Sequence, residues 1–217
     1  MMARFYGVYL DNTGISTVLD IVRFLGQPDS IRFSHITLRG PYADPGLTKA
    51  RIQGINDGYK KDRLVKMIAP TTFFSERQST VVIAVELGNL QELFYKPNFP
   101  TGTPHLTIYD GKSRQFAQSL YDIVSRYIWD ASLSVGALQA IESKHRVDGE
   151  FLPFFTKFCE YFGALVGDPK QIASMSGVSA NRRLELIESV LERCVQTSEP
   201  KVLPMDRELI SRQSAYA

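Results

Sequence analysis

Cysteine, histidine and long apolar runs are scarce in this chain of 217 residues. Its two cysteines, Cys159 and Cys194, lie in stretches with helical patterning, where two buried thiols or a disulfide are the alternatives. No apolar run approaches the roughly 20 residues that span a bilayer, and the residues after Met1 do not form a signal peptide. We therefore expect a cytoplasmic protein with no membrane partner.

A strong excess of one charge is also absent. The chain has 25 basic and 23 acidic residues, which leaves a formal net charge of +2. Proteins that bind nucleic acid duplexes usually show a strong basic excess or a basic stripe. A small phosphate-bearing ligand needs only one or two well-placed cations, so the composition still allows a nucleotide partner.

Apolar patterning predicts a domain of strands and helices over residues 1–145 and a helical extension with a flexible tail over residues 146–217. In the first part we expect strands over 4–10, 32–39, 64–74, 80–87, 105–109 and 133–141, and helices over 15–25 and 113–129. We expect a loop that can include a short strand over 41–61, and one or two helical turns over 89–95. In the second part we expect helices over 151–166, from Asp168 onward and over 179–195, followed by a loose tail from Thr197.

Two segments repeat the order strand, helix, strand, and each ends in a His-x-Thr motif. The first motif is His35-Ile36-Thr37-Leu38 and the second is His105-Leu106-Thr107-Ile108. Because side chains alternate along a strand, the histidine and threonine of each motif point to one face and the aliphatic residues to the other. The repetition predicts a pseudo-two-fold domain in which the two motif strands face each other.

The two motifs suit the cleavage of a phosphodiester. This reaction needs a base that activates the nucleophile and an acid that protonates the leaving oxygen. Imidazole, with an unperturbed pKa of roughly 6.5, can do either near neutral pH. The hydroxyls of Thr37 and Thr107 can donate hydrogen bonds to the phosphate oxygens. We therefore predict that His35, Thr37, His105 and Thr107 form one catalytic site that needs no metal and no cofactor.

The same face is predicted to continue to the fourth residue after each histidine. If the strands stay regular, Arg39 lies beside Thr37 and Tyr109 lies beside Thr107. Arg39 is a candidate phosphate ligand, and Tyr109 is a candidate for stacking on a base or donating its hydroxyl. The alternatives are a solvated cation and an aromatic residue at the rim.

The paired motifs resemble those of the two-histidine (2H) phosphoesterase superfamily, over roughly residues 4 to 142. This group includes bacterial 2′-5′ RNA ligase-like proteins, cyclic phosphodiesterases and phage nucleases that destroy cyclic-nucleotide alarm signals. The resemblance implies a bilobal α+β fold, with two antiparallel sheets flanking a cleft. It also implies metal-independent cleavage of a nucleotide or short oligonucleotide: a 2′,3′-cyclic phosphate, a 2′-5′ linkage or a cyclic oligonucleotide. The compact spacing of the motifs resembles the phage nucleases more than the RNA ligase-like branch.

Other functions remain as alternatives. A binding protein could sequester a cyclic nucleotide or an RNA end in the same place, although binding alone does not require two titratable groups. The segment after residue 145 could instead make the chain an adaptor or an oligomer. A metal hydrolase would need clustered ligands, and Asp110 is the nearest acidic residue to either motif. The third histidine, His145, lies in a polar stretch and is expected at the surface.

Overall fold

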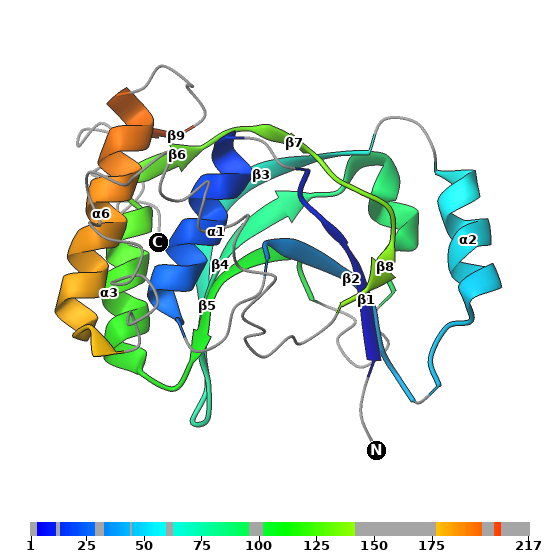
Figure 1. The fold of residues 1–217 in the computed structure, drawn as a ribbon, viewed down its shortest axis with the longest axis horizontal. Helices are drawn as coiled ribbons and strands as arrows, with labels where there is room; N and C mark the ends of the chain where they lie inside the picture. Colours follow the sequence, from blue (N-terminus) through cyan, green and yellow to red (C-terminus); the bar gives the residue numbers. More distant parts are fainter. Residues whose placement is uncertain are drawn as a thin grey trace, which may run out of the picture.

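The computed structural model describes residues 4–11, 14–28, 33–43, 45–59, 63–95, 102–141, 177–196 and 202–204. These residues form an α+β fold on one seven-stranded antiparallel sheet, in the order β7-β3-β4-β5-β2-β1-β8 (Figure 1). The strands of this sheet are β1 (Arg4–Tyr9), β2 (His35–Tyr42), β3 (Leu64–Phe74), β4 (Ser79–Glu86), β5 (His105–Gly111), β7 (Ser132–Ser134) and β8 (Gln139–Ala140). The α+β class agrees with the sequence prediction.

The helices lie at both ends of the curved sheet (Figure 1). They are α1 (Gly14–Gly26), α2 (Lys49–Gly58), the 3-10 helix η1 (Gly88–Leu93), α3 (Arg114–Val124) and α6 (Ala180–Gln196). A small second sheet joins β6 (Tyr127–Trp129) to β9 (Val202–Pro204). Within the described residues, none of the helices combines the length and the apolar content that a membrane crossing requires.

The prediction of two separate antiparallel sheets is wrong. The strands of both repeats belong to one sheet, because β2 pairs with β5 at Ile36 and Leu106 in its middle. Both residues are buried, with exposed fractions of 0% and 1%. The apolar middle residues of the two His-x-Thr motifs therefore hold the two halves of the sheet together.

The two predicted repeats are visible in the topology, and each contains one strand more than expected. The first repeat runs β1-α1-β2-α2-β3, and the second contains β4-η1-β5-α3 and, after the intervening β6 and β7, β8. The third strand of each repeat pairs with the first strand of the other, β3 with β4 and β8 with β1. Apart from β7, which is added to the edge at β3, the strand order is thus symmetric about the β2–β5 pair.

One extended segment joins the two edges of the sheet. At its start β7 pairs with β3, for example Leu133 with Val65. The chain then reaches β1, where Val135 forms a bridge with Leu10 and the Gly136 amide donates to the Tyr9 carbonyl at 2.9 Å. The predicted strand over residues 133–141 is therefore two short strands, one on each edge.

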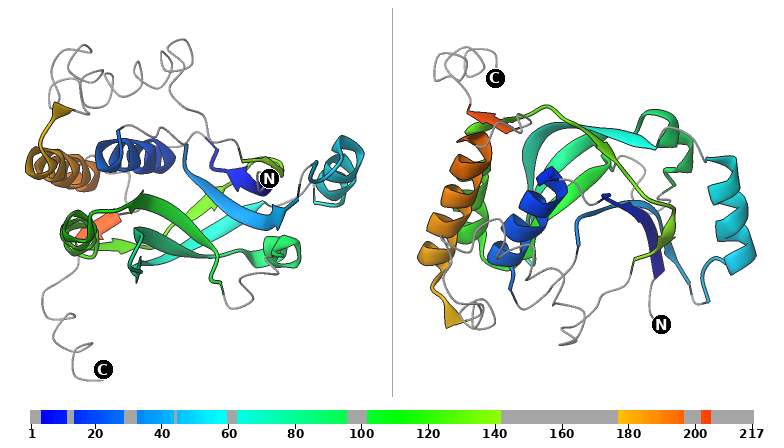
Figure 2. Two further views of the ribbon diagram at one scale, coloured as in Figure 1. Left: turned by 90° about the horizontal axis from the view of Figure 1, so that it is seen from below. Right: turned by 45° about the horizontal axis from the view of Figure 1, so that its top comes forward.

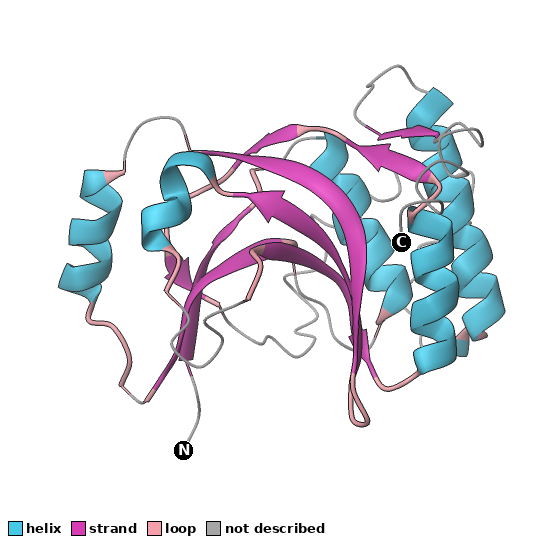
Figure 3. Cartoon of the chain, turned by 180° about the vertical axis from the view of Figure 1, so that it is seen from behind, coloured by secondary structure: helices cyan, strands magenta, loops and turns pink. Residues whose placement is uncertain are grey.

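Helix α6 packs against α1 and α3 in a layered cluster at one end of the sheet (Figure 2, Figure 3). Its apolar side chains Ile187, Val190 and Leu191 are fully buried in the same core as the sheet. Arg183 also links α6 to α1, because its Nη1 donates to the Leu25 and Gly26 carbonyls at 3.0 and 2.8 Å. The predicted domain boundary at residue 145 lies outside the described residues, as do the helices expected over 151–166 and after Asp168.

Three further differences concern element type. The expected loop over 41–61 contains α2, whose N-cap Thr48 accepts a hydrogen bond from the Arg51 amide at 3.3 Å. The helix expected over 113–129 ends at Val124, and the chain continues as β6. The Trp129 indole N–H donates back to the Val124 carbonyl at 2.8 Å and fixes this turn. Residues 202–204 of the expected loose tail form β9 against β6.

Candidate active site

The two His-x-Thr motifs lie side by side in the middle of the sheet. The antiparallel pairing of Ile36 with Leu106 sets Thr107 opposite His35 and His105 opposite Thr37. Since Ile36 and Leu106 point to the buried face, the two histidines and two threonines share the other face. The structure therefore brings the four predicted catalytic residues together, each histidine beside the threonine of the other motif.

Arg39 does not continue this face. Pairing with β1 places Gly7 opposite Thr37 but Tyr6 opposite Arg39, so Leu38 is an extra residue in a β-bulge. The bulge turns Arg39 to the side of buried Tyr6. There its Nε donates to the Leu93 carbonyl at 3.1 Å, and its guanidinium lies 5.9 Å from the centre of the Tyr95 ring.

Tyr109 leaves the face for the same reason. In the pairing of β5 with β4, Val82 lies opposite Thr107 and Val81 lies opposite Tyr109, which makes Ile108 the extra residue. The Tyr109 ring is 6% exposed and packs 5.1 Å from the Phe116 ring, centre to centre. The expectation that Arg39 and Tyr109 extend the catalytic face is therefore wrong, because each strand has a bulge directly after its motif threonine.

Both imidazoles are oriented by the same kind of hydrogen bond. His35 Nδ1 lies 2.8 Å from the Phe33 carbonyl oxygen, and His105 Nδ1 lies 2.7 Å from the Thr103 carbonyl oxygen. A carbonyl can only accept, so Nδ1 carries the hydrogen in both rings. In the neutral imidazole the basic lone pair then lies on Nε2. Each histidine is thus fixed by the carbonyl two residues before it.

Helix α1 holds the backbone just before His35. Asp20 Oδ1 accepts a hydrogen bond from the Ser34 amide at 2.6 Å, and Arg23 Nη1 donates to the Phe33 carbonyl at 3.4 Å. Arg23 is only 5% exposed. Burial raises the pKa of the Asp20 carboxyl group to about 6, although the hydrogen bonds from Ser34 and the charge of Arg23 lower it. The carbonyl that orients His35 is therefore itself held by a buried cation.

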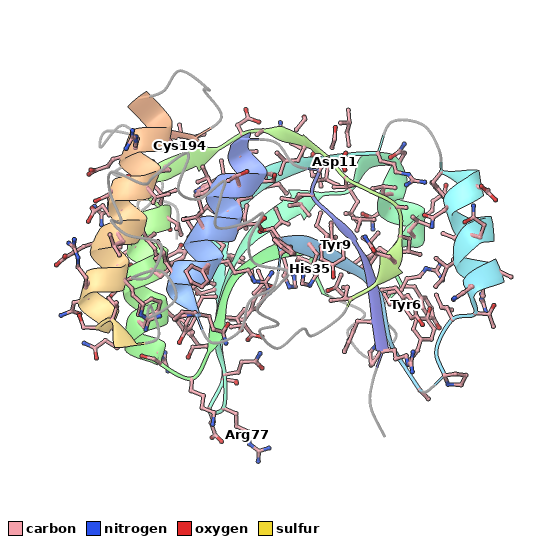
Figure 4. The ribbon with its side chains drawn as sticks, in the orientation of Figure 1. Tyr6, Tyr9, Asp11, His35, Arg77 and Cys194 are labelled. Carbon is pink, nitrogen blue, oxygen red and sulfur yellow. The ribbon has the colours of Figure 1, made fainter. Side chains whose placement is uncertain are left out.

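Each histidine also has an aromatic neighbour that the sequence analysis did not identify. The Tyr9 and His35 rings lie 5.4 Å apart with 52° between their planes, and both are labelled near the middle of the sheet in Figure 4. The Phe73 and His105 rings lie 6.1 Å apart with 48° between their planes. Tyr9 is the cross-strand partner of His35, so only the strand register could have identified it.

The burial of the two histidines differs. His35 is 7% exposed, whereas His105 is of intermediate exposure. Among the described residues, no three His, Cys, Asp or Glu side chains gather in a group that could hold a metal ion. Cys194 is partly buried against the core, while Cys159 and His145 lie outside the described residues.

Comparison of the chain with models of protein families, with curated proteins and with solved structures found no match.

Proposed function

We propose that this protein is a metal-independent phosphodiesterase of the two-histidine type, acting on a nucleotide phosphodiester. The observation that carries the proposal is the antiparallel placement of the two motifs about Ile36 and Leu106. It gives one face of the sheet two imidazoles and two hydroxyls in a symmetric arrangement. In acid–base cleavage of a phosphodiester, one imidazole can act as the base and the other as the acid.

The hydrogen bonds of the two rings support this chemistry. Because Nδ1 of His35 and of His105 each donates to a backbone carbonyl, Nε2 is the nitrogen that exchanges protons. One Nε2 accepts the proton of the attacking water while the water oxygen bonds to phosphorus. The other ring, protonated at Nε2, gives its proton to the leaving oxygen as the P–O bond breaks. The products are a phosphate monoester and an alcohol, and both rings then exchange protons with solvent.

The threonines complete the proposed site. Thr107 lies opposite His35, and Thr37 lies opposite His105. A hydroxyl on each side of the phosphate can donate to a non-bridging oxygen, where negative charge develops in the transition state. Arg39 and Tyr109 are not part of this proposal, because the bulges turn both side chains away.

A substrate panel tests the proposal. The full chain is incubated in EDTA with 2′,3′-cyclic nucleotides, 2′-5′ linked dinucleotides and cyclic dinucleotides, and the products are identified by mass spectrometry. We expect turnover that persists in EDTA and falls by a factor on the order of 100 or more in His35→Ala and in His105→Ala. The control is Thr72→Val, since Thr72 pairs with Val81 on the opposite face of the same sheet.

Three results would contradict the proposal. If EDTA abolished the activity and zinc or magnesium restored it, a metal-independent mechanism would be ruled out. If both histidine variants kept wild-type turnover, the two histidines would be ruled out as the catalytic site. Ligand that binds tightly and is recovered unchanged would favour a binding protein that sequesters a nucleotide.

A further inference from the structure

Aromatic rings lie on the outer side of both motif histidines. Tyr9 belongs to β1, which flanks β2, and Phe73 belongs to β3, which lies beyond β4. With the strand order β3-β4-β5-β2-β1, the side chains follow one another across the face as Phe73, His105, His35 and Tyr9. The array is aromatic, imidazole, imidazole, aromatic.

Phe73 is presented by the β-hairpin of β3 and β4. It pairs with Thr80 near the end of β3, and the turn that follows is closed by the Ser75 amide, which donates to the Gln78 carbonyl at 2.8 Å. The next residue, Phe74, points the other way and carries the Arg114 guanidinium 4.9 Å from its ring centre. Phe73 instead keeps 51% of its surface exposed. A ligand that covers this ring removes apolar surface from water, which favours binding.

We propose that Phe73 and Tyr9 are two nucleobase platforms, and that the substrate is a dinucleoside phosphodiester with one base on each side of the scissile phosphate. This inference rests on the proposed function. A dinucleoside phosphodiester has a base at each end and its phosphate in the middle. In the same way, the array of side chains has an aromatic ring at each end and the two imidazoles in the middle. Aromatic side chains bind bases by stacking and tolerate any base, because every base has a π-face. A cyclic mononucleotide has one base and can use one platform.

Kinetics with two substrate classes test the inference. Phe73→Ala and Tyr9→Ala are each assayed with adenylyl-adenosine, in its 2′-5′ and 3′-5′ forms and as the cyclic dinucleotide, and with 2′,3′-cyclic AMP. We expect each variant to raise KM for the dinucleotides by about 5- to 100-fold, with kcat nearly unchanged. We expect no more than one of the two variants to raise KM for 2′,3′-cyclic AMP.

Conservative variants separate stacking from packing. Tyr9→Phe and Phe73→Trp keep the π-face and should retain the wild-type KM, whereas Phe73→Leu keeps apolar bulk and should lose affinity as Phe73→Ala does. Ile68→Ala is the matched control, because Ile68 lies on the same strand and is 47% exposed. Thermal melting confirms that each variant is folded. If both alanine variants had the wild-type KM for the dinucleotides, the inference would be overturned. The proposed function would still stand, because the enzyme would still turn over its substrate.

Equilibrium binding distinguishes a failure of this inference from a failure of the proposed function. Calorimetry measures binding of 2′-5′ adenylyl-adenosine to the His35→Ala, His105→Ala double variant, with and without Phe73→Ala. Binding that weakens about 5- to 100-fold on loss of Phe73 supports the platform even if the wild-type chain shows no turnover. Binding that is equal in both chains, or absent in both, overturns it. The form of adenylyl-adenosine that gives the lowest KM shows whether the two bases belong to a linear or to a cyclic dinucleotide.

Discussion

The Asp20 carboxylate accepts a hydrogen bond from the amide of Ser34 at 2.6 Å, and Ser34 immediately precedes His35. A carboxyl group of helix α1 therefore fixes the entry to the first motif strand. Because burial raises the pKa of this group, its protonation state affects the stability of the fold.

We predict that Asp20→Asn changes the pH dependence of stability. Burial raises the pKa of Asp20 from 3.8 to about 6 in the folded chain. The folded state therefore holds this proton more tightly, and the resulting stability is complete below pH 3.8 and is lost as the pH rises through about 6. Asparagine cannot ionise, but its Oδ1 can still accept from the Ser34 amide. The variant should become more stable relative to wild type as the pH rises across this window.

Urea unfolding of both chains at several pH values checks this. Asp122→Asn is the control, because Asp122 is exposed in α3. Unfolding free energies of wild type and Asp20→Asn that stay a constant amount apart from pH 4 to pH 7 would show that Asp20 does not titrate in this window.

We predict that Gly7→Ala disrupts the pairing beside Thr37. A Cβ atom at Gly7 would overlap the Ile36 carbonyl oxygen and lie 2.8 Å from Ile141 Cδ1. Because the carbonyl is backbone, β1 and β2 must move apart, at a cost of about 1–3 kcal/mol. Turnover should fall together with the free energy of unfolding, measured by urea denaturation.

The matched control for Gly7 is Gly54→Ala in helix α2. Nothing lies within 4 Å of a Cβ atom at Gly54, so alanine should stabilise the helix by about 0.5–1 kcal/mol. If both alanine variants were equally stable, the close approach at Gly7 would have no energetic importance.

We predict that Arg183→Met weakens the contact between α6 and α1. Arg183 Nη1 donates to two carbonyls in the last turn of α1, and its guanidinium lies 4.8 Å from the centre of the Phe116 ring. Carbonyls at a helix C-terminus lack partners within the helix, and a cation there also interacts favourably with the helix dipole. We expect a loss of about 1–3 kcal/mol in thermal or chemical unfolding. Arg182→Met should cost about 0–1 kcal/mol, since its ion pair with Glu185 is exposed.

We predict that Thr37→Val and Thr107→Val lower kcat without unfolding the protein. Valine keeps the β-branched shape that a strand favours and removes only the hydroxyl donor. Loss of one donor to the developing phosphate charge should reduce kcat by a factor on the order of 100. Circular dichroism should match wild type, and a normal kcat in both variants would exclude the threonines from catalysis.

The alternation of residue types was enough to predict which face carries the two histidines and the two threonines. Ile36 and Leu106 are aliphatic residues between polar ones, so the period of two correctly placed the histidines and threonines on one side. The same reasoning failed at Arg39 and Tyr109, because a bulge depends on pairing with a neighbouring strand. Leu38 and Ile108 look like ordinary strand residues in the sequence, and each becomes the extra residue only when β1 or β4 is beside it.

Long-range pairing was the other limit. The sequence indicated a repeat, but it did not show that Ile36 pairs with Leu106 or that β3 and β8 exchange between the repeats. Helix α2 escaped prediction because its segment is mostly polar and has no buried residue. Tyr9 and Phe73 were not identified as neighbours of the histidines, since each contact depends on register or on sheet curvature.

The exchange of third strands also determines how far the molecule can be divided. A chain with only one repeat would leave the edge of its first strand unpaired, because β3 pairs with β4 and β8 pairs with β1. Such an edge accepts the equivalent strand of a second copy. Two copies would then place two identical motifs at a true symmetry axis. The protein thus has, within one chain, the strand pairing that a strand-swapped homodimer of one repeat would have.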